Sequence, residues 1–168
     1  MFIKQRNKLF KLKTPRSLKL VYVHGKGLGL FADKNFRKGE TIIAFKANTV
    51  DRAHASEEVV QIDENKFYDT KWLVPEAFIN HSCSPNARLG VAGKRYVAIR
   101  NIRKDEEITF DYNTTEWDMV KYGDDFECHC GSRNCMKRVR GLKHLSRDQQ
   151  QKLKPYLLPF LFGRISKL

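Results

Sequence analysis

Four cysteines are the residues of this 168-residue chain whose type and spacing most clearly suggest chemistry. Cys128, Cys130 and Cys135 lie close together, with one and four residues between them. That spacing lets three thiolates reach one tetrahedral metal ion. The fourth, Cys83, precedes them by 44 intervening residues. Structural zinc sites usually have four ligands, so a fold that brings Cys83 to the other three would complete such a site.

The fourth ligand has an alternative. His129 lies within the cluster, but its place between two ligands should point its side chain away from the ion. Cys83 is the better candidate because it would otherwise remain an unpaired thiol. Disulfides or simple burial compete with the metal interpretation, but the close spacing favours a metal in a reducing compartment. We therefore expect structural Zn²⁺ bound by Cys83, Cys128, Cys130 and Cys135, and a cytoplasmic or nuclear protein.

A second candidate site surrounds Cys83. The polar run Asn80-His81-Ser82-Cys83 follows two apolar residues and precedes a Pro-Asn turn signal. Each of these side chains needs a partner if it is buried, so the run is poorly suited to a core. If Cys83 joins the late cysteines, the chain folds back and carries residues 110–112 close to Asn80 and His81.

Short strands joined by turns are predicted to position these residues. Residues 1–19 read as a basic arm with little fixed structure, and 51–66 as a short helix or a variable insert. Ser146 can cap a helix with Leu153, Tyr156 and Leu157 on one face, limited by Pro155. A strand is expected at 20–23, followed at 24–32 by a glycine-rich turn that enters a second strand, and another strand is expected at 95–99. Two similar turn-then-strand units are expected at 35–43 and 101–110.

The formal charge of +13 is unevenly distributed. Residues 1–26 hold eight Lys/Arg and no acid, and residues 136–168 hold nine against one acid. The span 27–135 holds 15 basic and 18 acidic residues, so it is mildly acidic. Two interpretations stay open for the basic ends, namely contact with nucleic acid and solvated faces that aid solubility. The acidic centre suits a basic ligand.

The sequence contains no clear signal for secretion, membrane insertion or import into peroxisomes. A secretory signal is not expected, because the first residues lack an apolar core of adequate length. The apolar run 156–162 is broken by Pro159 and is too short to span a bilayer, so we expect no membrane partner. The terminal Ser166-Lys167-Leu168 matches a peroxisomal address, and we interpret that match as coincidence.

Four segments in order resemble the SET-domain family of S-adenosylmethionine-dependent protein lysine methyltransferases. Residues 27–32 resemble the family's glycine motif, 78–86 its Asn-His-Ser-Cys motif, 106–112 its catalytic-tyrosine strand and 128–135 its post-SET zinc segment. Singly the glycine motif is weak evidence. The four in order are specific, and they cover roughly residues 18–137.

The resemblance implies a mainly β fold of several small curved sheets with a pseudoknot, a post-SET zinc segment and a helical C-terminal tail. We expect a basic arm at 1–17, the SET domain at 18–113, the post-SET segment at 114–140 and a basic helical extension at 141–168. We also expect a monomer. The family's segment takes its fourth zinc ligand from the Asn-His-Ser-Cys motif, in agreement with the choice of Cys83.

The resemblance also implies roles for individual residues. Gly27, Leu28 and Gly29 would approach S-adenosylmethionine through their backbone, and Asn80 and His81 would hold its amino-acid and adenine parts. Tyr112 would orient the lysine amine and contact the cofactor. Glu107 and Asp111 are interpreted as structural. Phe110 matches the family's Phe/Tyr position, where phenylalanine leaves space for a methylated amine, so di- or trimethylation is expected.

Several features depart from the family. No cysteine-rich segment precedes the core, Ala77 replaces a frequent arginine, and Phe45 falls where some members place a second active-site tyrosine. Trp117, Tyr122 and Phe126 either wall the lysine channel or belong to the core.

The function implied is methyl transfer to lysine in a protein, either a histone or another basic protein such as a ribosomal one. The alternative is an inactive SET-like zinc module that binds nucleic acid or chromatin. Keeping Phe110 and Tyr112 together with the glycine and Asn-His motifs favours the enzyme.

Overall fold

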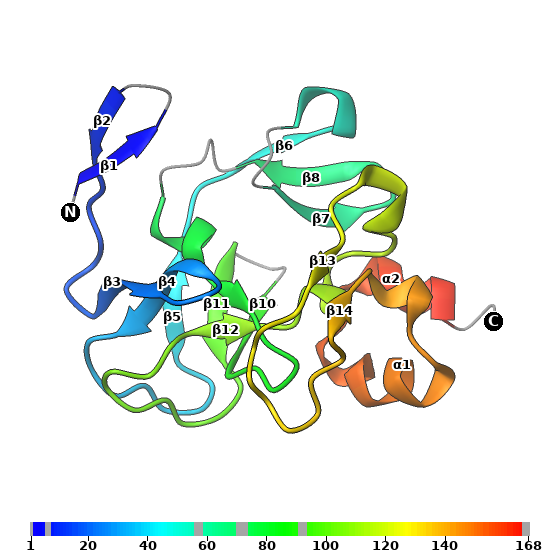
Figure 1. The fold of residues 1–168 in the computed structure, drawn as a ribbon. Helices are drawn as coiled ribbons and strands as arrows, with labels where there is room; N and C mark the ends of the chain where they lie inside the picture. The colour runs from blue at the N-terminus through cyan, green and yellow to red at the C-terminus, as the bar shows by residue number, and fades with distance from the viewer. Residues whose placement is uncertain (1, 6–7, 56–58, 70–73, 91–93, 166–168) are drawn as a thin grey trace.

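In the part of the chain that the structure describes, short strands form six small sheets of two or three strands each (Figure 1). The structure is a computed structural model that describes residues 2–5, 8–55, 59–69, 74–90 and 94–165. The predicted mainly β fold of several small sheets is confirmed. The sheets are β1 (Phe2–Gln5) with β2 (Lys8–Lys11); β3 (Leu18–Val23) with β4 (Gly27–Ala32); β10 (Ala87–Gly90), β11 (Arg95–Ala98) and β5 (Thr41–Ala44); β6 (Asn48–Val50), β8 (Lys66–Asp69) and β7 (Val59–Asp63); β12 (Thr109–Phe110) with β9 (Asn80–His81); and β13 (Phe126–Glu127) with β14 (Arg138–Val139).

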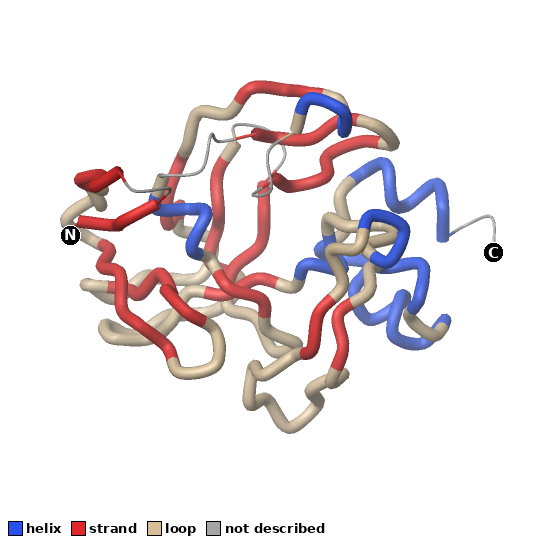
Figure 2. Tube along the Cα trace, turned by 45° about the horizontal axis from the view of Figure 1, so that its top comes forward, coloured by secondary structure: helices blue, strands red, loops and turns tan. Residues whose placement is uncertain are grey.

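The predicted helical C-terminal tail is also present, on the side of the molecule opposite the N-terminal hairpin (Figure 2). Ser146 accepts a hydrogen bond from Gln149 N in a capping box that starts α1 (Arg147–Leu153). Pro155 then interrupts the helix, and α2 (Pro159–Ile165) follows. None of the helices in the described ranges has the length and apolar character needed to cross a membrane. Residues 166–168 lie outside the described residues. Short 3₁₀ turns occupy Arg52–His54, Pro75–Phe78, Tyr112–Thr114, Val120–Tyr122, Leu142–His144 and Lys154–Tyr156.

One expectation about local structure is wrong and a second is incomplete. The arm at 1–19 is not without fixed structure, because β1 and β2 pair antiparallel and Leu12 is buried. Residues 51–66 contain β7 besides a 3₁₀ turn, because a run that starts with two valines favours a strand once β8 offers a partner.

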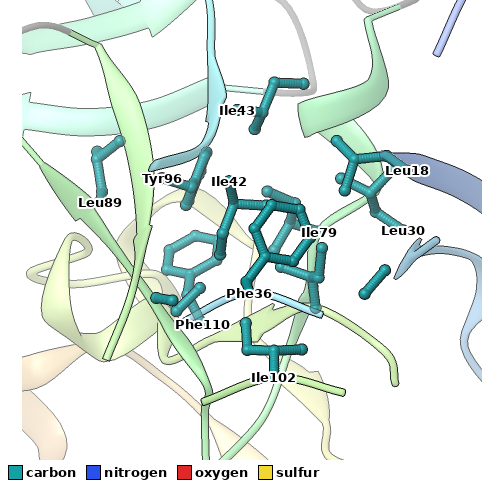
Figure 3. Close-up of a cluster of buried hydrophobic side chains, with 14 of the residues drawn as sticks. Leu18, Leu30, Phe36, Ile42, Ile43, Ile79, Leu89, Tyr96, Ile102 and Phe110 are labelled. Atoms are coloured by element: carbon teal, nitrogen blue, oxygen red, sulfur yellow. The ribbon is translucent and has the colours of Figure 1, made fainter. Parts of the chain in front are cut away.

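The main hydrophobic core lies among the small sheets (Figure 3). The two similar turn-then-strand units meet there: Phe36 and Ile102 exchange backbone hydrogen bonds of 2.8 and 2.9 Å, and both side chains are almost fully buried. Leu30, Ile79 and Ile108 pack in the same cluster. The core therefore fixes the segments that lead into β9 and β12.

A parallel pairing joins segments far apart in the sequence. Thr109 pairs with Asn80 and Phe110 with His81, so β12 passes beside the loop that follows β9. Asn86, which is 1% exposed, holds this crossing in place. Its Oδ1 accepts from Thr109 N at 2.9 Å, and its Nδ2 donates to Glu107 O at 2.7 Å. The crossing is the pseudoknot expected from the sequence.

Replacing Asn86 with alanine should destabilise the fold. The change leaves two buried backbone groups without partners, at about 1–3 kcal/mol each. We expect the free energy of unfolding to fall by about 2–4 kcal/mol in urea denaturation. Asn101→Ala is the matched control, since Asn101 makes a single exposed bond to Lys38 N and should cost less than about 1 kcal/mol. Equal costs for the two variants would contradict this role of Asn86.

Candidate active site and metal centre

The β9–β12 crossing places His81 against Tyr112. His81 is 4% exposed, and its Nδ1 accepts a hydrogen bond from Tyr112 N at 3.2 Å. Burial and the positive charge of Lys26 lower the pKa of His81 to about 4. The imidazole is therefore neutral at pH 7, with its Nε2 3.3 Å from Cys83 Sγ. One buried ring thus links the tyrosine strand to the thiol cluster.

Tyr112 stands between two cavities. Its hydroxyl donates to Ile79 O at 3.0 Å, and its ring centroid lies 4.7 Å from that of Phe110 and 5.8 Å from that of Phe126. A smaller cavity of about 290 Å³ lies on one side and a larger one of about 390 Å³ on the other. Among the described residues, only Tyr112 and Phe126 line both.

The smaller cavity contains three of the residues predicted to bind the cofactor, Asn80, His81 and Tyr112. The glycine-rich run reaches it through Gly25 and Lys26 rather than through residues 27–29. Sequence reasoning missed these two positions, although they belong to the same turn. The other lining residues are Phe126, Glu127, Cys128, His129 and Cys130.

The predicted glycine motif supports Asn80 from behind. Asn80 Nδ2 donates to Leu28 O at 3.2 Å and to Glu107 Oε1 at 2.9 Å. A Cβ at Gly29 would lie 2.9 Å from that same Glu107 oxygen and 3.0 Å from Asn80 Nδ2, so a side chain at this position would displace Glu107 or Asn80. Glu107 also pairs with Lys26 Nζ at 2.5 Å. Leu28 and Glu107 therefore hold the side chain of Asn80, and Glu107 also holds that of Lys26.

The four thiols converge, as the sequence led us to expect. Sγ atoms of Cys83, Cys128, Cys130 and Cys135 all lie within 4.8 Å of one another, and the Cys83–Cys128 pair is 3.9 Å apart. His129 is exposed and is not part of this group. Backbone N–H groups of the segment donate to the sulfurs, including Met136 N to Cys83 at 3.4 Å.

The donor set fits zinc. Tetrahedral Zn²⁺ with sulfurs at about 2.3 Å requires sulfur–sulfur distances of about 3.8 Å, close to the separation of Cys83 and Cys128. Burial raises the pKa of Cys83 far above its usual range and that of Cys128 to about 11. Four thiolates this close together need a cation to stay ionised.

The larger cavity is aromatic on the side of Tyr112. Phe110 is buried, and its ring centroid lies 5.2 Å from that of Tyr96. Phe45 lines the same cavity but has no hydroxyl group. The ring centroid of Tyr96 lies 5.7 Å from that of Phe45, and Tyr96 does carry a hydroxyl group. Sequence reasoning treated Tyr96 only as part of a strand. The remaining lining residues are Arg52, Val59, Val60, Tyr68, Glu76, Ala77, Ile79, Glu116, Met119, Asp124 and Phe126.

The alternatives left open for three aromatic residues are now separated. Phe126 walls both cavities. Trp117 packs instead against the hydrophobic cluster of the C-terminal helices. Tyr122 stacks edge-on with Phe67 and lies under the guanidinium of Arg52. Neither lines either cavity.

Glu116 joins β7 to the segment after Tyr112. Its Oε1 accepts from Gln61 N at 2.8 Å and from the Thr115 hydroxyl at 3.2 Å. Gln61 Oε1 in turn accepts from Trp117 N at 2.9 Å. Burial raises the pKa of Glu116 to about 7. These bonds hold the sheet of β6, β8 and β7 against the segment after Tyr112, which forms part of the wall of the larger cavity.

Comparison with known proteins identifies the family pattern. The model of the family described as SET domain matches residues 27–113. A histone-lysine N-methyltransferase of Arabidopsis thaliana, ASHH3, is 29% identical over 153 residues, with 79% of this chain and 41% of the relative covered. An H3 lysine-36 specific enzyme of Yarrowia lipolytica is 30% identical, with 80% of this chain and 20% of the relative covered. An H3 lysine-4 specific enzyme of Emericella nidulans is 35% identical, with 77% and 12% covered.

Solved structures agree with this fold. KRYPTONITE in complex with mCHH DNA, an H3(1-15) peptide and SAH is 25% identical, with a TM-score of 0.59, covering 78% of this chain and 30% of that one. The methyltransferase domain of human SETMAR is 16% identical, with a TM-score of 0.55 over 74% of this chain and 58% of that one. The chain thus spans less than half the length of the curated relatives described above.

The pKa of Glu116 predicts how stability depends on pH. A glutamate in the unfolded chain has a pKa of about 4.3, so between that value and about 7 the folded protein binds more protons. The free energy of unfolding should therefore fall as pH rises through this window. Glu116→Gln keeps an acceptor for Gln61 N, so at pH 8 its Tm should exceed that of the wild type by about 2–4 °C.

At pH 4.5 the difference in Tm between Glu116→Gln and the wild type should be much smaller, because Glu116 is then protonated in the folded state and only partly ionised in the unfolded state. Glu127→Gln, at an exposed position, serves as the control and should show no such pH-dependent difference. A Glu116→Gln protein less stable than the wild type at pH 8 would contradict the assignment.

Proposed function

The chain belongs to the SET-domain family, and on that premise we propose that it transfers methyl groups from S-adenosylmethionine to the ε-amine of lysine in a protein substrate. The observation that carries the proposal is the position of Tyr112. Its side chain separates two cavities, one suited to the cofactor and the other to an alkyl amine.

The smaller cavity fits S-adenosylmethionine by its chemistry. Lys26 offers a cation for a carboxylate, and Asn80 and His81 offer hydrogen-bonding groups. The rings of Tyr112 and Phe126 suit a positively charged sulfonium. Gly27, Leu28 and Gly29 act in this proposal mainly by holding Asn80 in place. When bound, the cofactor supplies a methyl group on that sulfonium.

Tyr112 and its neighbours orient the amine. The Tyr112 hydroxyl is directed to the carbonyl of Ile79, which lines the larger cavity, so a lysine nitrogen there would meet both oxygens. A lysine of pKa ~10.4 must lose a proton, at a cost of roughly 4–5 kcal/mol at pH 7. A nearby positive charge lowers that cost by like-charge repulsion. The proton leaves to water through the larger cavity, and orientation supplies several kcal/mol of the barrier.

The substrate in this proposal is a basic protein. Three of the four ionisable carboxylate or guanidinium groups that line the larger cavity are acids, Glu76, Glu116 and Asp124. Histones and other lysine-rich proteins match this charge. The named relatives act on different lysines of histone H3, so resemblance to them does not choose the target. Contact of the basic ends with nucleic acid and the monomeric state remain predictions.

The zinc site completes the two cavities. Cys128 and Cys130 line the smaller cavity, and Phe126 lies just before them. Zn²⁺ held by Cys83, Cys128, Cys130 and Cys135 would therefore fix the wall shared by both cavities, while the main core lies elsewhere.

Tyr112→Phe should lower kcat by about 100-fold, the scale expected when a reacting group loses its orientation. The measurement is transfer of labelled methyl groups to histones, ribosomal proteins and a cell lysate. Tyr22→Phe is the matched control, because Tyr22 is 72% exposed and outside both cavities. A folded, zinc-loaded Tyr112→Phe protein with wild-type activity would remove Tyr112 from the mechanism.

The products of the same assay test Phe110. Space beside this side chain predicts that mass spectra under excess cofactor show di- or trimethyl-lysine. Products that stop at one methyl group would contradict that expectation. If no protein is methylated although calorimetry detects binding of S-adenosylmethionine, the inactive-module alternative gains support.

Cys135→Ser should abolish methyl transfer and lower the zinc content below one ion per chain, while far-UV circular dichroism retains most of the β signal. The physical reason is that the core lies apart from the thiols, whereas the shared cavity wall does not. Ser84→Ala, at an exposed position next to Cys83, should change neither quantity. Full activity in protein stripped of metal would refute the link.

A further inference from the structure

Glu76 is a buried carboxylate that the proposed mechanism does not yet use. It lies in the 3₁₀ turn Pro75–Phe78, directly before β9, is 8% exposed and lines the larger cavity. Among the described residues, no other residue donates a hydrogen bond to its side chain or forms an ion pair with it. Burial raises its pKa. An ionised carboxylate in this state costs free energy unless a ligand compensates it.

The other carboxylates of the cavity are already engaged. Asp124 pairs with Arg52 at 2.7 Å, and Glu116 accepts from Gln61 N and the Thr115 hydroxyl. Glu76 is followed by Ala77, which offers no charge to neutralise it. Glu76 therefore differs from Asp124 and Glu116 in that, among the described residues, no other residue contacts its carboxylate through a hydrogen bond or an ion pair.

Tyr96 supplies a second polar group on the same wall. It is 2% exposed, it lines the larger cavity, and its hydroxyl has no hydrogen-bond partner among the described residues. Burial, followed by the charges of Tyr112, Glu76 and Glu116, raises its pKa well above the usual range. The phenol thus lies within the electrostatic influence of Glu76. Around the two groups the wall is apolar, formed by Phe45, Ile79 and Phe110.

We propose that Glu76 is a specificity-determining residue that recognises the positively charged amino group of the substrate, with the Tyr96 hydroxyl as a second acceptor. An apolar wall with one free carboxylate is complementary to an alkylammonium: the methylene groups pack on the rings and the N–H groups donate to oxygen. This inference rests on the proposed function, because it makes the larger cavity the entry for lysine. In this proposal Glu76 selects the charged amine, whereas Tyr112 orients it for methyl transfer.

The test measures binding of a minimal amine, so it does not depend on methyl transfer. The zinc-loaded full chain is titrated with n-butylammonium chloride and with 1-butanol, which has the same chain length and no charge. Amide signals of residues 76–79 are followed by NMR in an amine-free buffer. We expect butylammonium to bind about tenfold or more tightly than 1-butanol, as a hydrogen bond to a charged group implies.

Glu76→Gln should abolish that preference while its Tm stays equal to or above the wild-type value, because a desolvated charge has been removed. Tyr96→Phe should weaken butylammonium binding by a smaller factor. Glu64→Gln is the control, since Glu64 is an exposed carboxylate outside both cavities, and it should change the affinity less than twofold.

A wild-type protein that binds the alcohol as well as the ammonium would overturn the proposal, and so would an undiminished preference in Glu76→Gln. The wild-type comparison keeps the test decisive if a variant does not fold. Amine selection by Glu76 without detectable methylation of any protein would leave this inference intact and count against the enzymatic function alone.

Discussion

The parallel pairing of β9 with β12 is the constraint on which the rest of the site depends. It is only two residue pairs long, yet it brings Tyr112 to His81 and lets the following segment reach Cys83. So short a ladder has little stability of its own. Asn86 lies in the loop beside which β12 passes, and its side chain compensates for the short ladder. It accepts a hydrogen bond from Thr109 N in β12 and donates one to Glu107 O, just before β12. A buried amide thus stabilises a topology that strand pairing alone would hold weakly.

The two cavities differ in charge. Lys26 and Glu127 line the smaller one and offset each other, while three carboxylates and one arginine line the larger one. The chain as a whole has a formal net charge of +13, so the acidic lining of the larger cavity is a local exception to a basic protein. Burial raises the pKa of Glu76 and Glu116, which shows that the protein tolerates carboxylates where folding alone would disfavour them. Such positions commonly reflect function rather than stability.

Part of this arrangement was predictable because the chemistry of the residues is local and specific. Three closely spaced cysteines and one remote thiol indicated a common site, and a polar run beside Cys83 indicated a loop. The N-terminal hairpin and β7 were not foreseen, because their strands form only when a partner is present. Lys26, Glu76 and Tyr96 were missed for another reason. Their significance lies in what surrounds them, since a glutamate or tyrosine in a short motif does not reveal whether its oxygen has a partner.

The order of the thiols along the chain has a consequence for how the protein is made. Cys83 lies two residues after the end of β9, whereas its three companions follow β12, so the four thiols meet only when the segment after β12 has returned to the β9 loop. Hairpins such as β3–β4 close locally and early, while the crossing joins distant segments at a higher entropic cost. Since synthesis proceeds from the N-terminus, the last cysteine leaves the ribosome after everything it must join. A cation held by all four thiols would therefore be bound late in synthesis, after the three C-terminal cysteines have emerged.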